Sequence, residues 1–159
     1  MDSLYRGSLI LAKANEALEK TGQQRPQTDL DAIANHYGIT VRRGARAAGV
    51  VAHFDAARNE IVLGEFERWP YAHELGHALL RHGNRTCYEG TMATDAPLAE
   101  VDMGVPFEAE ANRFARNVLV PKAWLEFLLS RGWQPKDLPG RFGVSENVFW
   151  FAFRGYGLI

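Results

Sequence analysis

The apolar positions near the start of the chain follow a helical period. In residues 3–21 they recur every three or four positions and stop at Gly22, a favoured residue at helix C-termini, which predicts an amphipathic helix. The same spacing returns over Asp29–Tyr37, just before Gly38, and Thr28 is placed to cap the start of this second helix. The beginning of the chain is therefore predicted to be helical.

The hydrophobic period then changes to that of β-strands. Three short segments rich in β-branched residues, at 39–41, 49–54 and 60–63, are separated by glycine, aspartate and asparagine. Residues 55–59 have the composition of a turn. These segments predict a small, mainly antiparallel three-stranded sheet, and the strand at 49–54 is expected to pair with an extended peptide if it lies at the sheet edge.

Helical spacing resumes and dominates the rest of the chain. One helix is expected to end at about His82, before Gly83, and residues 84–105 then form a connection long enough to line a cleft. Further helices are expected over residues 106–119, after Pro121 as far as Ser130, and from Ser145 onward. The order of these elements predicts an α+β fold in which helices pack against the small sheet.

The most informative chemistry lies within the predicted helix that ends at His82. It contains His73-Glu74-Leu75-Gly76-His77, an HExxH motif. Because each helical residue turns by about 100°, His73 and His77 project from one face and can bind one metal ion, with Glu74 beside them as a base. Two imidazoles and a carboxylate at this spacing indicate a hydrolytic zinc site, in which Glu74 takes a proton from a water that the metal activates.

A catalytic zinc site normally has three protein ligands, so a third must come from elsewhere. The acidic candidates downstream are Glu89, Asp95, Glu100, Asp102, Glu108 and Glu110. Only the last two lie on a predicted helix, and Glu110 points roughly 200° away from Glu108. Glu108 is therefore the predicted third ligand. The alternative is that Glu108 only favours the positive end of its own helix.

Glu108 shares one helical stripe with Ala111, Asn112 and Ala115. The two small alanines would let this helix approach the histidine helix closely enough for the carboxylate to reach the metal. Asn112, one turn after Glu108, is expected to accept a hydrogen bond from the ring N–H of His73 and so fix its tautomer. The alternative is that Asn112 is a polar surface residue.

The remaining histidines and the single cysteine are interpreted as structural or surface residues. His82 lies five positions after His77, about 140° around the helix, so it is expected to face elsewhere near the negative end of the helix dipole. His36 and His53 have no partner at metal-ligand spacing, and Cys87 is interpreted as a bystander thiol.

Length and composition restrict the possible functions further. A chain of 159 residues with 47% hydrophobic content fits one domain with a substantial core. The formal charge of −1 disfavours direct nucleic-acid binding, and the basic cluster of Arg42, Arg43 and Arg46 is interpreted as a solvated strand end. One cysteine excludes a disulfide framework. With no signal-peptide pattern and no apolar run of roughly 20 residues, the chain is expected to act in the cytoplasm, away from membranes.

Two longer stretches extend these motifs. Residues 73–80 surround the HExxH sequence, and residues 107–115 contain Glu108 in an ExxAN sequence that is followed by Val118-Leu119-Val120-Pro121. In these stretches the chain resembles the ImmA/IrrE family of cytoplasmic zinc peptidases. The resemblance implies a single metallopeptidase domain over residues 1–159, with a family-like core over 28–159 and a peripheral N-terminal helix over 1–25.

The resemblance also implies a site and an activity. It implies His73, His77 and Glu108 as gluzincin-like ligands of one Zn²⁺ ion, a site that Mn²⁺ or Fe²⁺ would also fit, and Glu74 as the catalytic base. It implies a site-specific endopeptidase whose protein substrate is a helix-turn-helix transcriptional repressor of a phage or mobile element, cleaved under stress. Tyr88, in the long connection, is a candidate oxyanion stabiliser, with a plain surface tyrosine as the alternative. A second hypothesis is a non-proteolytic module that sequesters a repressor or antitoxin.

Overall fold

The computed structural model describes residues 2–44, 50–64, 68–83, 85–88 and 106–158 of the chain. Their elements, in order, are α1 (Asp2–Lys20), α2 (Leu30–His36), β1 (Thr40–Arg43), β2 (Val50–Asp55), β3 (Glu60–Leu63), α3 (Arg68–Leu79), β4 (Arg85–Tyr88), α5 (Pro106–Leu119), α6 (Lys122–Ser130), the 3-10 turn η1 (Pro135–Asp137), α7 (Leu138–Phe142) and α8 (Glu146–Gly155). The α+β prediction is confirmed.

The strands form one mixed sheet in the order β1-β3-β2-β4. β1 runs parallel to β3, whereas β2 is antiparallel to both β3 and β4. The three predicted strands are all present, and β4 is a fourth that comes from the segment expected to be a connection. Pairing with β2, rather than a local hydrophobic pattern, decides the conformation of β4.

This sheet order corrects one expectation about substrate binding. β2 is hydrogen-bonded on one side to β3 and on the other to β4, so it is an inner strand. An extended peptide cannot add to a strand whose backbone groups are already paired on both sides. Within the described residues, the strands at the edges of the sheet are β1 and β4.

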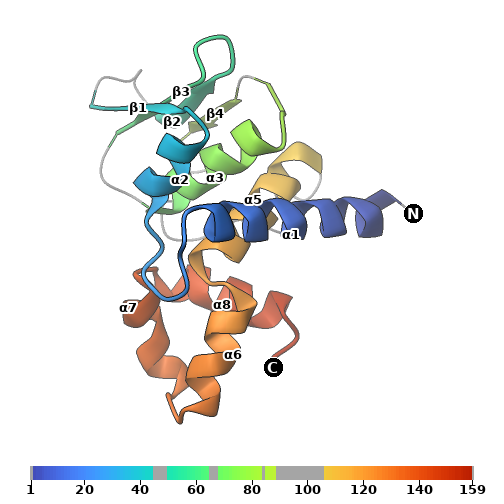
Figure 1. The fold of residues 1–159 in the computed structure, drawn as a ribbon, viewed down its shortest axis with the longest axis vertical. Coiled ribbons are helices and arrows are strands. Elements are labelled where there is room, and N and C mark those ends of the chain that lie inside the picture. The colour runs from blue at the N-terminus through green and yellow to red at the C-terminus, as the bar shows by residue number, and fades with distance from the viewer. Residues whose placement is uncertain (1, 45–49, 65–67, 84, 89–105, 159) are drawn as a thin grey trace.

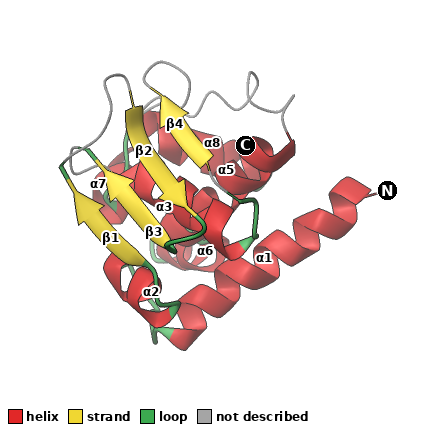
Figure 2. Ribbon diagram, turned by 90° about the horizontal axis from the view of Figure 1, so that it is seen from above, coloured by secondary structure: helices red, strands yellow, loops and turns green. Residues whose placement is uncertain are grey.

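The helices lie on one side of the sheet, with α2 and α3 against its strands and α6, α7 and α8 at the end of the molecule away from it (Figures 1 and 2). α3 contacts β2 and β3 on one side and α5 on the other, so it lies between the sheet and α5. α1 crosses α5, and its Ile10, Ala14 and Ala17 are buried in the same hydrophobic core. Because α3 is covered from two sides, all of its residues from Trp69 to His77 are buried.

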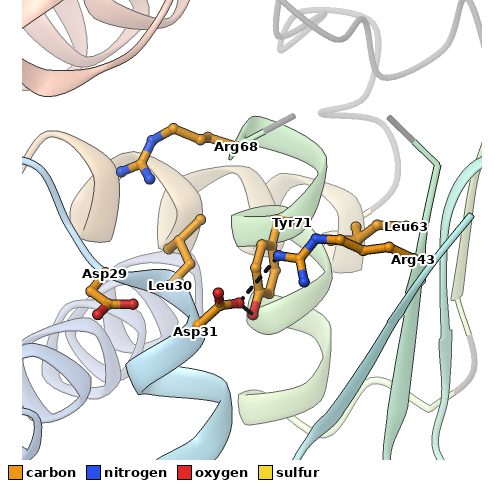
Figure 3. Close-up of a pocket in the computed structure, with 7 residues that line it drawn as sticks. All are labelled: Asp29, Leu30, Asp31, Arg43, Leu63, Arg68 and Tyr71. Atoms are coloured by element: carbon orange, nitrogen blue, oxygen red, sulfur yellow. Dashed lines mark hydrogen bonds and ion pairs between the residues drawn. The ribbon is translucent and has the colours of Figure 1, made fainter. Parts of the chain in front are cut away.

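A polar network fixes the first turn of α3 to α2 and β1 (Figure 3). The Tyr71 hydroxyl donates to Oδ1 of Asp31 at 2.7 Å, and Nη2 of Arg43 lies 3.2 Å from the same oxygen. The hydrogen bond from Tyr71 lowers the pKa of Asp31, whereas burial raises the pKa of Tyr71. Of the predicted basic cluster, Arg43 therefore pairs with a carboxylate. Arg42 pairs with Glu60 at 3.3 Å, and Arg46 lies outside the described residues.

The predicted cap of α2 is displaced by one residue. Asp29 is the N-cap, and its Oδ1 accepts from the Ala32 N–H at 3.0 Å. Thr28 is buried instead, and its hydroxyl donates to the Val118 carbonyl, which belongs to α5, at 2.5 Å. Both residues can cap a helix, and the tertiary contact with α5 decides which one does.

Candidate metal centre

Two helices supply the candidate metal ligands, and a very close helix crossing brings them together. A Cβ atom added to Gly76 of α3 would lie 3.1 Å from Cβ of Phe114 and 3.2 Å from Cα of Ala111, both in α5. The small, fully buried Ala111 faces this crossing, as the helical stripe predicts, and Ala115, one turn further along α5, is also fully buried. Gly76 is equally necessary for the close approach of the two helices, because it has no Cβ. Its role as a contact residue was not predicted from the sequence.

At this crossing His73 and His77 of α3 face Glu108 of α5. Nε2 of His73 lies 2.9 Å from Oε1 of Glu108, and Nε2 of His77 lies 3.1 Å from Oε2. The two Nε2 atoms are 3.0 Å apart. All three residues offer donor atoms within 4.8 Å of one another, so this group could hold a metal ion. Both histidine side chains are fully buried, and that of Glu108 is 22% exposed.

The hydrogen bond behind His73 tests whether a metal fits this group. Nδ1 of His73 lies 2.9 Å from Oδ1 of Asn112. A carbonyl oxygen only accepts, so Nδ1 carries the proton, and in the neutral ring Nε2 is left with a lone pair. That lone pair points at the carboxylate of Glu108. Two electron-pair donors at this distance attract each other only through a shared cation, and a divalent metal satisfies both.

The protonation states suit metal binding as well. Burial lowers the pKa of His77 to about 4, although the hydrogen bond and the charge of Glu108 act in the opposite direction. For Glu108 burial acts to raise the pKa, but the two histidine rings beside its carboxylate outweigh it and hold the pKa well below its usual range. At neutral pH His77 is therefore uncharged and Glu108 is ionised, the forms in which each binds a metal.

The remaining predicted site residues are placed as follows. Glu74 lies between the two histidines in the sequence of α3 and is fully buried. Asn112 is fully buried against His73, which is the contact expected from its position one turn after Glu108. Tyr88 ends β4, but its side chain lies outside the described part of the structure, as does the rest of the connection up to residue 105.

The expectation for His82 is wrong. His82 is buried, and its Nδ1 lies 2.8 Å from Nδ1 of His77. On its other side, Nε2 of His82 lies 2.8 Å from Oε1 of Glu110, the carboxylate that points away from the other ligands. Both residues therefore belong to the surroundings of the candidate metal centre.

The end of α3 explains this placement. The helix stops at Leu79, and Arg81 adopts a left-handed conformation with a φ of 62°. The N–H of His82 then bonds back to the His77 carbonyl at 2.9 Å, and that of Arg81 to the Ala78 carbonyl at 3.2 Å. This is a Schellman motif, which folds its last residue back over the final helical turn. The prediction assumed that the helix continued through His82, and the sequence has no glycine at position 81 to indicate otherwise.

An α+β domain in which an HExxH helix and a second helix bring two histidines and a glutamate together has the architecture of a metallopeptidase. The chain matches the model of the IrrE N-terminal-like domain, peptidase family M78, over residues 34–153, and it therefore belongs to this family. The resemblance found in residues 73–80 and 107–115 is thus confirmed. A comparison with curated proteins found no match. Among the described residues, no helix is long and apolar enough to span a membrane.

Proposed function

We propose that this protein is a zinc-dependent, site-specific endopeptidase of the cytoplasm that cleaves a regulatory protein. The observation that carries the proposal is the convergence of His73, His77 and Glu108 in a buried group whose donor atoms lie within 4.8 Å of one another. A peptidase family implies a protein substrate. The resemblance to ImmA/IrrE proteins favours a helix-turn-helix repressor of a phage or mobile element.

The proposed roles follow from the positions of the side chains. His73, His77 and Glu108 hold the metal, and Zn²⁺ suits two imidazoles and one carboxylate, although Mn²⁺ and Fe²⁺ accept the same ligands. Bound zinc supplies Lewis acidity, which polarises the scissile carbonyl and makes water more acidic. Asn112 holds His73 with Nε2 directed at Glu108.

Glu74 is the proposed general base and acid. Its carboxylate accepts a proton from the attacking water, whose oxygen forms the new bond to the scissile carbon. As the C–N bond breaks, Glu74 returns that proton to the leaving nitrogen, so the products are a carboxylic acid and an amine. Because Glu74 is fully buried, competing bulk water is excluded from this transfer.

Glu74→Gln tests this proposal. Glutamine has nearly the same shape but cannot accept the proton, so cleavage of the proposed repressor substrate should fall by about 10²–10⁴-fold while zinc remains bound. Glu60→Gln is the matched control, since Glu60 lies in β3 and pairs with Arg42. Cleavage by the Glu74 variant at the control rate would contradict the peptidase proposal. If the variant still relieves repression in cells at the wild-type level, the protein acts by sequestration.

A further inference from the structure

The ring nitrogen of His77 that faces away from Glu108 contacts another histidine. Metal-binding histidines usually donate this second N–H to a carboxylate, a backbone carbonyl or water. In this chain Nδ1 of His77 lies 2.8 Å from Nδ1 of His82, and Nε2 of His82 lies 2.8 Å from Oε1 of Glu110. Three side chains thus form a continuous line from the candidate metal centre to a second carboxylate.

Only one arrangement of protons satisfies this line when Nε2 of His77 binds a metal. The neutral His77 ring then carries its proton on Nδ1 and donates it to Nδ1 of His82. Nδ1 of His82 must therefore be unprotonated, and the His82 proton lies on Nε2. That N–H donates to the carboxylate of Glu110, which only accepts when it is ionised. Each donor meets an acceptor.

The surrounding structure holds His82 in this position. Its side chain is 1% exposed and that of Glu110 is 10% exposed, so neither is freely solvated. The ring of Phe107 stacks on the His82 ring, with centroids 4.3 Å apart and planes 16° apart. The Schellman motif also ties the His82 backbone to the His77 carbonyl. The His82 ring is therefore fixed by stacking, by its backbone and by hydrogen bonds at both nitrogens.

We propose that His82 and Glu110 are positioning residues for the metal ligand His77. They hold its proton on Nδ1, keep its Nε2 directed at the metal, and transmit the negative charge of Glu110 to the ring, which strengthens Nε2 as a donor. The two histidine ligands are thus oriented differently. The neutral amide of Asn112 orients His73, whereas His82, hydrogen-bonded to the charged carboxylate of Glu110, orients His77. This inference rests on the proposed metal centre.

Zinc affinity tests the positioning role. Zn²⁺ binding is measured by competition with a chromophoric chelator for the wild-type protein, Glu110→Gln, His82→Leu and His82→Asn. Glu110→Gln and His82→Leu should each weaken zinc binding by about 10–100-fold. His82→Asn should lose less, because its amide oxygen occupies nearly the position of Nδ1 and still accepts from His77. Glu60→Gln removes a carboxylate of β3 that pairs with Arg42, and this variant should bind zinc as the wild type does.

The histidine tautomers provide a readout that a purely structural role would not dictate. In the zinc-loaded wild-type protein with ¹⁵N-labelled histidine, two-bond ¹H–¹⁵N spectra should show the proton of His77 on Nδ1 and that of His82 on Nε2. A proton on Nδ1 of His82 would overturn the inference even if no variant folds. Wild-type protein that binds no zinc refutes the metal centre itself. Tight wild-type binding that the His82 and Glu110 variants retain refutes only the positioning role.

Discussion

Gly76→Ala should disturb the metal centre without touching any proposed ligand. The added methyl group would lie 3.1 Å from Cβ of Phe114 and 3.2 Å from both Cα and the carbonyl oxygen of Ala111. These atoms belong to the backbone of α5, or are attached directly to it, at two fully buried residues, so they cannot swing aside as the end of a flexible side chain would. α3 and α5 must therefore separate by a few tenths of an ångström.

The sign of the stability change depends on two opposing effects. Replacing glycine by alanine inside a helix favours the helix by about 1 kcal/mol. Overpacking a close-packed contact costs about 1–3 kcal/mol. The free energy of unfolding should therefore fall by up to about 2 kcal/mol. Zinc binding should weaken by about tenfold in addition, since Glu108 moves with α5 and metal–ligand distances tolerate only about 0.2 Å of change.

Gly7→Ala is the matched control, because Gly7 also lies inside a helix and a Cβ there would meet nothing within 4 Å. In this variant the free energy of unfolding should rise by about 0.5–1 kcal/mol, and zinc affinity should equal that of the wild type. Both quantities are measured, the first by urea unfolding of metal-free protein and the second by chelator competition. If Gly76→Ala gains as much stability as Gly7→Ala and keeps its zinc affinity, the close crossing does not set the ligand geometry.

Three further predictions concern residues around the site and the end of the chain. Arg81→Gly should raise the free energy of unfolding by about 0.5–1 kcal/mol, because glycine adopts the φ of 62° without strain, whereas Arg131→Gly, at a φ of −90°, should not. The pKa of His77 falls from 6.5 in the unfolded chain to about 4 in the folded one, so the unfolded state binds more protons between these values. Metal-free protein should therefore lose about 3 kcal/mol of stability as the pH drops from 6.5 to 4, and His77→Gln should flatten that pH profile. Tyr156→Phe removes the hydroxyl that donates to the Val120 carbonyl at 2.8 Å, so the free energy of unfolding should fall by about 1–2 kcal/mol. Urea unfolding measures this change, and an unchanged denaturation midpoint would contradict the prediction.

Much of the candidate site could be predicted from local helix geometry. A turn of about 100° per residue places His73 and His77 on one face, and it separates Glu108 from Glu110 on the second helix. The same rule places Asn112 one turn after Glu108, and the structure has it bonded to His73. These relations depend only on spacing within one helix, so the sequence alone determines them.

Other features depend on contacts between distant segments, and local spacing does not contain them. β4 is a strand because β2 pairs with it, and Thr28 leaves the cap of α2 to bond with α5. His82 was misplaced because a left-handed residue ended the helix before it. The HExxH motif, its helix and the family were thus readable from the sequence. The tertiary structure decided how closely α3 and α5 approach and which side chains surround His77, because packing between elements sets both.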